Sequence, residues 1–112
     1  RFVTVHLDAA NEPVRVAQAG EVVKFLAGAG PAVITGDFND VPGSKTMDAF
    51  TPPRSVVTKS GSPLTYPATA PEIEIDHFLV RELKVIEKAR VLEEKVASDH
   101  RPVVAVLERN AE

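Results

Sequence analysis

Two short polar runs, far apart in the sequence, carry the side chains best suited to chemistry. The run Gly36–Asn39, Gly-Asp-Phe-Asn, follows the apolar segment Ala32–Thr35, and the run Ser98–His100 stands just before the valine-rich segment Pro102–Glu108. Carboxylate and amide oxygens hold hard divalent cations, and an imidazole exchanges protons near neutral pH. Active sites of α/β proteins lie at the ends of buried strands. The two runs together favour metal-assisted chemistry on a phosphate ester.

The spacing within each run indicates how its side chains are arranged. Asp37 and Asn39 are two residues apart, so in an extended backbone we expect them to face the same side. A carboxylate and an amide placed together could hold a cation, orient a water molecule and hydrogen-bond a phosphate oxygen. Asp99 and His100 are adjacent, and we expect them to point in different directions. The carboxylate would then be available to a metal and the imidazole to the reacting group.

Three further polar residues lie in apolar strand patterns. Asp76 interrupts the segment Ile73–Val80, and a carboxylate in such a position needs a partner. His6 is polar in the segment 2–8. His77 follows Asp76 directly, and alternation along a strand turns it to the opposite face. We therefore expect His77 to have a structural role.

Each of these features alone also has a purely structural explanation. Gly, Asp and Asn are turn formers, so the run Gly36–Asn39 by itself could be a simple turn. Asp99 could cap the entry to a strand, and a lone strand histidine such as His6 is more often structural than catalytic. Four other acidic residues are expected to be loop or surface carboxylates: Asp40, Asp48, Glu72 and Glu74. The hypothesis of a site depends on the whole set and on its order along the chain.

The first part of the chain predicts a strand, a helix and a second strand. Residues 2–8 alternate between apolar and polar side chains, which is typical of a strand. Asn11 can cap a helix that has Pro13 in its first turn, and four apolar residues at helical spacing form one face. These four are Ala19, Val22, Val23 and Leu26. The short apolar segment Ala32–Thr35 is expected to be a buried strand.

The second part of the chain predicts a short helix, a long loop and three strands. Ser44 is expected to cap the helix, which runs through Phe50. Residues 51–72, rich in Pro, Thr and Ser, are expected to form a loop with brief strands near Val56–Val57 and Leu64–Tyr66. A loop of this length is usually functional or mobile. The three longer strands are expected at Glu74–Val80, Leu83–Leu92 and Pro102–Glu108.

Length and composition limit the class of protein. The 112 residues predict a single domain, 1–112, and 44% hydrophobic with 26% charged residues is ordinary for a globular protein. The chain has no cysteine, which excludes disulfides and thiolate metal sites, and no apolar run as long as a membrane span. A net charge of -3 makes nucleic acid a less favoured partner without excluding it, because bound divalent cations can reverse the local field. The sequence does not indicate a cellular location.

The order of the motifs resembles the endonuclease/exonuclease/phosphatase superfamily, which has the deoxyribonuclease-I-like fold. The matching segments cover almost the whole chain: Val5–Asp8, Arg15 with Gln18, Gly36–Asn39, Tyr66–Pro67, Ile75–Val80 and Ser98–Val103. The resemblance implies an α/β fold, a sheet with flanking helices that is one half of the deoxyribonuclease-I-like sandwich. The chain begins inside a strand pattern without Met, so we interpret it as a fragment, and the resemblance implies that it is the C-terminal half of the family's fold. The family's N-terminal half supplies an Asn and a metal-binding Glu, which no strand before His6 carries here.

The resemblance also implies a role for each residue of the site. His6 corresponds to the histidine that contacts the scissile phosphate, and Asp37 to the carboxylate that orients the attacking water. Asn39 corresponds to the amide that positions this nucleophile and the phosphate. His100 corresponds to the histidine beside the reacting phosphoryl group, oriented by Asp76. Substrate contacts would therefore come from His6, Asn39 and His100.

A divalent cation, Mg²⁺ or Mn²⁺, is the cofactor that the resemblance implies. Its expected ligands are Asp37, Asn39 and Asp99. Such a cation would neutralise phosphate charge and stabilise the leaving oxygen.

Two functional hypotheses follow. The first is a Mg-dependent phosphoesterase that acts on phosphodiesters or phosphomonoesters in the intact protein, whereas the fragment alone could lack this activity. The second is a non-catalytic half-domain, or a degenerate relative, that self-associates or pairs with another chain, because a half-sandwich leaves an apolar sheet face uncovered. Loop 51–72 has few basic or aromatic residues, namely Arg54, Lys59 and Tyr66. This favours a small-molecule or lipid-headgroup ester over nucleic acid.

Overall fold

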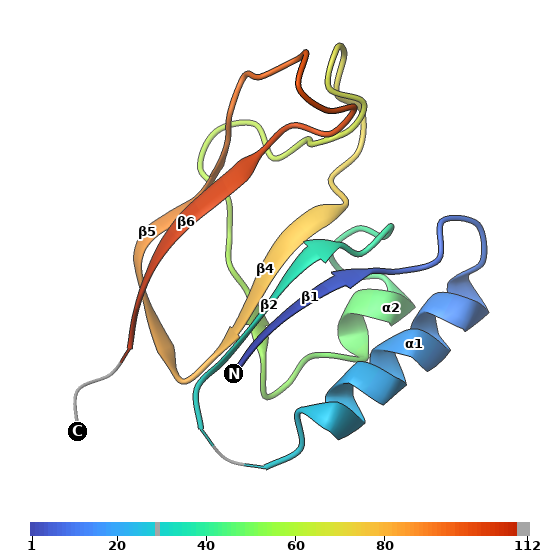
Figure 1. Ribbon diagram of the computed structural model, residues 1–112, viewed down its shortest axis with the longest axis vertical. Coiled ribbons are helices and arrows are strands. Elements are labelled where there is room, and N and C mark those ends of the chain that lie inside the picture. Colours follow the sequence, from blue (N-terminus) through green and yellow to red (C-terminus); the bar gives the residue numbers. More distant parts are fainter. Residues whose placement is uncertain (29, 110–112) are drawn as a thin grey trace.

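The structure, a computed structural model, describes residues 1–28 and 30–109 (Figure 1). These residues contain six strands and two helices, joined by loops. In chain order they are β1 (Phe2–His6), α1 (Glu12–Phe25), β2 (Ala32–Asp37), α2 (Lys45–Asp48), β3 (Ser55–Val56), β4 (Asp76–Arg81), β5 (Leu83–Val91) and β6 (Val103–Arg109). Four strands form a sheet in the order β1-β2-β4-β3, and β5 pairs with β6 in a second sheet. In Figure 1 the helices lie on one side of the larger sheet and the β5–β6 pair on the other. The expected α/β class, with sheets and flanking helices, is confirmed.

The first two strands are parallel and are joined by α1, as the apolar pattern predicts. Asn11 caps the helix, since its side-chain oxygen accepts the N–H of Val14 at 3.2 Å. Ala19 and Leu26 of the predicted apolar face are buried against the sheet. The core on this side also contains Leu7, Ile34, Phe38, Met47, Phe50 and Leu79. Within the described residues, no helix has the length and apolar character needed to cross a membrane.

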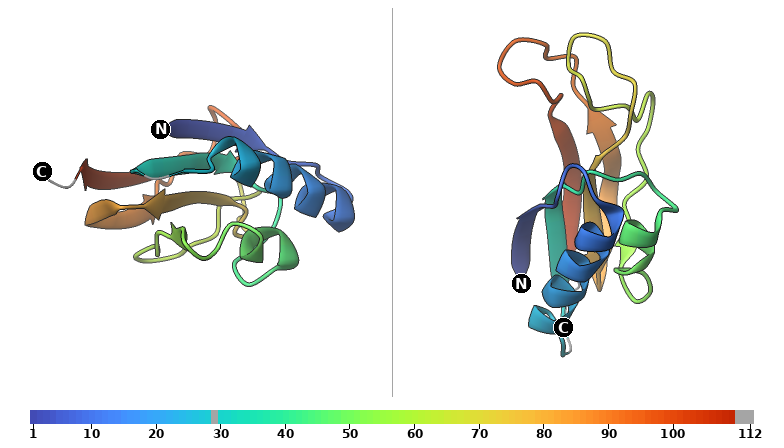
Figure 2. Two further views of the ribbon diagram at one scale, coloured as in Figure 1. Left: turned by 90° about the horizontal axis from the view of Figure 1, so that it is seen from below. Right: turned by 90° about the vertical axis from the view of Figure 1, so that its right-hand side faces the viewer.

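The other face of the larger sheet is covered only in part. Its core consists of Val33, Val57, Val80 and Ala89, with half-buried side chains of β6 packed against them. The smaller sheet contacts the larger one chiefly through β6 and β4, whereas β1 lies at the edge of the larger sheet (Figure 2). Phe2 of β1 is consequently 72% exposed.

Some element boundaries differ from the prediction. β1 ends at His6 rather than at residue 8, because the carboxylate of Asp8 accepts two following backbone N–H groups and turns the chain. Leu64–Tyr66 is not a strand, and in the described part of the chain it contributes an isolated bridge from Tyr66 to Ile73. The predicted brief strand near Val56 is present as β3.

The short helix α2 is capped as predicted. The Ser44 hydroxyl accepts the N–H of Met47 at 3.2 Å, but the helix ends at Asp48 rather than at Phe50. The three long strands begin and end close to their predicted limits.

Gly36 allows β1 and β2 to approach closely beside the predicted site. Its φ is +135°, a region that L side chains rarely adopt, and a Cβ atom here would collide with the carbonyl oxygen of Val5. Only glycine meets both requirements. The residue before Asp37 is therefore determined by backbone sterics.

Candidate active site

Strand register brings three of the predicted site residues into one row across the larger sheet. His6 of β1 stands opposite Asp37 of β2, and Asp37 stands opposite Asp76 of β4. Residues in register on neighbouring strands direct their side chains to the same face. This is the face away from the helices, because the alternate residues Val3 and Val5 pack against the core on the helix side.

His100 reaches this row from the loop between β5 and β6. Its Nδ1 lies 2.8 Å from Asp76 Oδ2, and the N–H at Nδ1 donates to the carboxylate. Partial burial alone would lower the pKa of the His100 imidazole. The hydrogen bond and charge of Asp76, together with the charges of Asp37 and Asp99, outweigh burial and raise this pKa above its ordinary value of 6.5. The cationic form of His100 therefore persists to higher pH than it would in an ordinary imidazole.

The long proline-rich loop supports the segment that carries His100. The N–H of Ala68 donates to the carbonyl oxygen of Asp99 at 2.7 Å, and the N–H of Arg101 donates to that of Thr65 at 2.8 Å. The Nε–H of Arg101 also donates to the carbonyl oxygen of Ala68 at 2.8 Å. These bonds hold both sides of His100 against the loop.

Asp37 lies at the centre of the row, between two imidazoles. Its Oδ2 is 3.6 Å from His6 Nε2 and 3.5 Å from His100 Nε2. Both distances are longer than a good hydrogen bond, so this carboxylate is close to both imidazoles without being tightly bonded to either. Its Oδ1 accepts the N–H of Asn39 at 2.9 Å, which fixes the orientation of the carboxylate.

Asn39 lines the same cavity as Asp37, although it lies beyond the end of β2. The prediction that it faces the same side as Asp37 in an extended backbone is wrong, because β2 ends at Asp37 and Asn39 has a φ of 51°. Asn tolerates this left-handed conformation better than most residues. The Nδ2–H of Asn39 donates to the carbonyl oxygen of Leu7 at 2.6 Å, which ties the side chain to the end of β1.

All the predicted site residues line one cavity of about 610 Å³. They are His6, Asp37, Asn39, Asp76, Asp99 and His100. Ligand atoms of Asp37, Asp76 and His100 lie within 4.8 Å of one another, so these three residues form a candidate metal-binding group. Asp99 is exposed and is not in this group.

Tyr66 also lines the cavity but is not among the predicted site residues. Its ring centroid lies 4.7 Å from that of His100, with an angle of 46° between the ring planes. The sequence carries one signal for it, an aromatic residue directly before Pro67 in the long loop.

Two carboxylates expected on the surface are instead engaged in largely buried ion pairs. Asp40 Oδ2 lies 3.1 Å from Arg15 Nε, and the two side chains are 13% and 11% exposed. Glu74 Oε2 lies 2.6 Å from Lys59 Nζ, and the Lys59 side chain is 1% exposed. The surface prediction is therefore wrong for Asp40 and Glu74, because their partners come from distant segments that local patterns do not reveal. The other two carboxylates are exposed, as predicted: Asp48 and Glu72.

His77 lies on the helix side of β4, opposite Asp76, as alternation predicts. Its ring is buried and makes an edge contact with Phe38, at 5.5 Å between ring centroids. Burial lowers the pKa of this imidazole, so His77 is neutral near pH 7.

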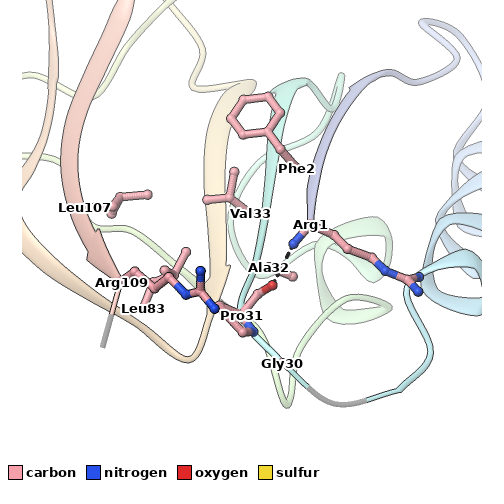
Figure 3. Close-up of a pocket in the computed structure, with 9 residues that line it drawn as sticks. All are labelled: Arg1, Phe2, Gly30, Pro31, Ala32, Val33, Leu83, Leu107 and Arg109. Carbon is pink, nitrogen blue, oxygen red and sulfur yellow. Dashed lines mark hydrogen bonds between the residues drawn. The ribbon is translucent and has the colours of Figure 1, made fainter. Parts of the chain in front are cut away.

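A second cavity, of about 600 Å³, lies at the opposite end of the sheet (Figure 3). Its apolar walls come from four strands and include Phe2, Val33, Leu83 and Leu107. Its described lining contains none of the predicted site residues. These walls have the character of a packing surface.

Comparison with known proteins agrees with this fold. The sequence model described as Endonuclease/Exonuclease/phosphatase family matches residues 2–100. The fold is similar to that of a functionally unknown conserved protein from Enterococcus faecalis, with a TM-score of 0.83 and 24% identity. It is also similar to a mannosyl-6-phosphatase from Bacteroides thetaiotaomicron, with a TM-score of 0.78 and 24% identity.

These structural alignments cover 96% and 95% of this chain but only 50% of each of the other two chains. The chain therefore spans about half the length of these relatives. Comparison with curated proteins gives no significant sequence match.

Proposed function

The chain belongs to the endonuclease/exonuclease/phosphatase family, and on that premise we propose that the intact protein hydrolyses phosphate esters with the help of a divalent cation. The observation that carries this proposal is the position of Asp37 between the imidazoles of His6 and His100. A carboxylate in this position can orient a water molecule and accept its proton. The imidazoles beside it can meet the negative charge of the phosphate.

We propose a separate role for each of three other side chains that line the cavity. We assign His6 to the scissile phosphate, because its side chain is 77% exposed at the cavity wall. Asn39, held by the carbonyl oxygen of Leu7, would position the nucleophile and a phosphate oxygen. His100, whose cationic form is favoured by the hydrogen bond to Asp76, would stabilise the charged transition state beside the phosphoryl group.

The donor atoms of the cavity fit a hard divalent cation such as Mg²⁺ or Mn²⁺. Carboxylates and a side-chain amide are the oxygen ligands that these ions prefer. We propose Asp37, Asn39 and Asp99 as the ligands, since Asp76 is already engaged by His100. When bound, the cation would neutralise phosphate charge and stabilise the leaving oxygen.

A small phosphate ester is the favoured class of substrate. The net charge of -3 and the scarcity of basic and aromatic residues in loop 51–72 count against a surface that tracks a nucleic-acid backbone. One structural relative is a mannosyl-6-phosphatase, so a sugar phosphate belongs in a test panel beside inositol phosphates, sphingomyelin and DNA.

Hydrolysis by the full-length protein is expected to require a divalent cation. Addition of EDTA should abolish turnover of the best ester in this panel, and Mg²⁺ or Mn²⁺ in excess should restore it, because the proposed ligands are oxygens. Product release measured with and without chelator decides the point. Turnover that resists EDTA would contradict the metal dependence, and failure to hydrolyse any ester would contradict the proposed function.

A second role, pairing with further polypeptide, is favoured by the uncovered sheet face beside β1. Phe2 is 72% exposed, and within the described residues β1 and β6 each pair along one edge. The chain also spans about half the length of its structural relatives. We propose that this face packs against the other half of the sandwich, because an open strand edge and an exposed aromatic ring favour further strand pairing.

The 112-residue chain alone should therefore self-associate as its concentration rises, without forming one defined species. Phe2→Lys should weaken this association, whereas Val96→Lys, at a residue that is 92% exposed in a loop, should leave it unchanged. Sedimentation velocity measures both variants. A stable monomer at every concentration would contradict the need for a partner, and a single discrete dimer would identify a second copy as the occupant instead.

A further inference from the structure

A series of hydrogen-bonded polar side chains, two of them fully buried, leads from the helix side of the sheet to the loop after β2, which carries Asn39. Its members are Glu74, Lys59 and His77, and the side chains of Lys59 and His77 are 1% and 0% exposed. Water cannot reach the polar atoms of Lys59 and His77 at this depth, so each must find a protein partner, whereas the side chain of Glu74 is 19% exposed. None of these three residues has a part in the proposed reaction.

The contacts of His77 determine which of its nitrogens carries the hydrogen. Nε2 lies 2.8 Å from the backbone carbonyl oxygen of Asp40, which can only accept, so Nε2 donates. Nδ1 lies 3.3 Å from Lys59 Nζ, which as an ammonium can only donate, so Nδ1 accepts. Lys59 is held in turn by Glu74 at 2.6 Å. This series of side chains therefore ends in the Nε2–H of His77, which donates to the backbone carbonyl of Asp40 in the loop after β2.

Asp40 is held at its side chain as well as at its backbone. Its carboxylate accepts the Nε–H of Arg15 at 3.1 Å, and Nη1 of Arg15 donates to the carbonyl oxygen of Asp8 at 3.1 Å. Arg15 thus connects the loops that follow β1 and β2. With His77 at the carbonyl and Arg15 at the carboxylate, Asp40 is fixed at both ends.

The residue before Asp40 is the one that needs this support. Asn39 has a φ of 51°, a conformation that costs energy for a residue other than glycine and persists only when its surroundings enforce it. On one side Asp37 is fixed by its strand pairing, and on the other side Asp40 is fixed by His77 and Arg15. The N–H of Asn39 also orients the carboxylate of Asp37. A shift of the Asn39 backbone would therefore displace the side chains of both Asn39 and Asp37.

We propose that His77 is a positioning residue for the active site, whose Nε2–H holds the carbonyl of Asp40 so that Asn39 and Asp37 keep their arrangement. Lys59 and Glu74 keep the imidazole in the tautomer that this bond requires. The catalytic consequence rests on the proposed function, whereas the effect on the loop does not.

Two substitutions separate the hydrogen bond from the packing of the ring. His77→Phe keeps an aromatic ring beside Phe38 but removes the donor, and His77→Gln can place an amide N–H near the position of Nε2. In the full-length protein we expect kcat to fall roughly 10- to 100-fold in His77→Phe, the range for residues that orient metal-site groups, with KM nearly unchanged. His77→Gln should recover most of this loss. Equal losses in the two variants, or a loss confined to KM, would overturn the proposal.

A measurement that needs no turnover separates this proposal from the proposed function. Amide hydrogen exchange at residues 39–41 should be faster in His77→Phe than in the wild type and close to the wild type in His77→Gln. Unchanged exchange in His77→Phe would overturn the proposal even if the protein is an active phosphoesterase. If His77→Phe does not fold, nitrogen NMR of the wild-type imidazole decides. A hydrogen on Nε2 supports the proposal, and a hydrogen on Nδ1 overturns it.

Discussion

Asp37→Asn should lower kcat/KM for phosphate-ester hydrolysis by about 1,000-fold, within the range for loss of a general base. Asparagine has nearly the same shape, and its side-chain oxygen can still accept the N–H of Asn39. What it lacks is the negative charge that would orient and deprotonate water between His6 and His100. The loss should therefore appear mainly in kcat, measured by product release from the best ester of the panel.

The same substitution should raise the concentration of Mg²⁺ needed for half-maximal activity, because one proposed oxygen ligand loses its charge. Asp48→Asn is the matched control, since Asp48 is an exposed carboxylate outside the cavity and its loss should leave both quantities unchanged. The thermal unfolding temperature of each variant shows whether the fold persists. A folded Asp37→Asn variant with wild-type kcat would remove Asp37 from the mechanism.

Local patterns predicted the strands that carry the site because the signals for those strands are themselves local. Apolar periodicity and the Asn11 cap indicate β1, α1 and β2 without any distant contact. Once such strands pair in register, residues at their ends, such as Asp37 and Asp76, lie side by side. Polar residues at strand ends were therefore a sound guide to the cavity.

Long-range partners and loop conformations had no such signal. Asp40 and Arg15 are 25 residues apart, and Glu74 and Lys59 are 15 residues apart, so neither buried pair follows from a helical or strand period. The left-handed conformation of Asn39 depends on where β2 ends, and strand ends are the least predictable feature of a sequence pattern. These are also the residues that hold the proposed catalytic groups in place.

Asp76→Asn should lower kcat by about 100-fold and should also move the alkaline limb of the pH–rate profile to lower pH. Burial alone would lower the pKa of His100, and Asp76 is the main group that reverses this effect. In the wild type the imidazolium persists above pH 6.5, so activity that needs this cation is lost only as pH rises through the raised pKa. Without the charge of Asp76, only Asp37 and Asp99 oppose the effect of burial, so the pKa of His100 falls and its cation is lost at lower pH.

The variant pair Asp76→Asn and His100→Gln tests whether the two residues act as one unit. His100→Gln should itself cost at least as much kcat as Asp76→Asn, since it removes the charged group. Adding Asp76→Asn to it should cost little more, because the carboxylate then has no imidazole to orient. Losses that simply multiply would contradict a dyad.

The Asp76–His100 hydrogen bond also distinguishes a dyad from a metal site that uses the same residues. The ligand atoms of Asp37, Asp76 and His100 lie within 4.8 Å of one another and could together hold an ion. If Asp76 were a ligand, Asp76→Asn would raise the Mg²⁺ requirement as Asp37→Asn does. The 2.8 Å bond instead commits Asp76 Oδ2 and His100 Nδ1 to each other, so the Mg²⁺ requirement of Asp76→Asn should stay close to that of the wild type while its pH limb moves. If Asp76→Asn raised the Mg²⁺ requirement and left the alkaline limb of the pH–rate profile in place, Asp76 would be a metal ligand. His100 would then lack its proposed partner.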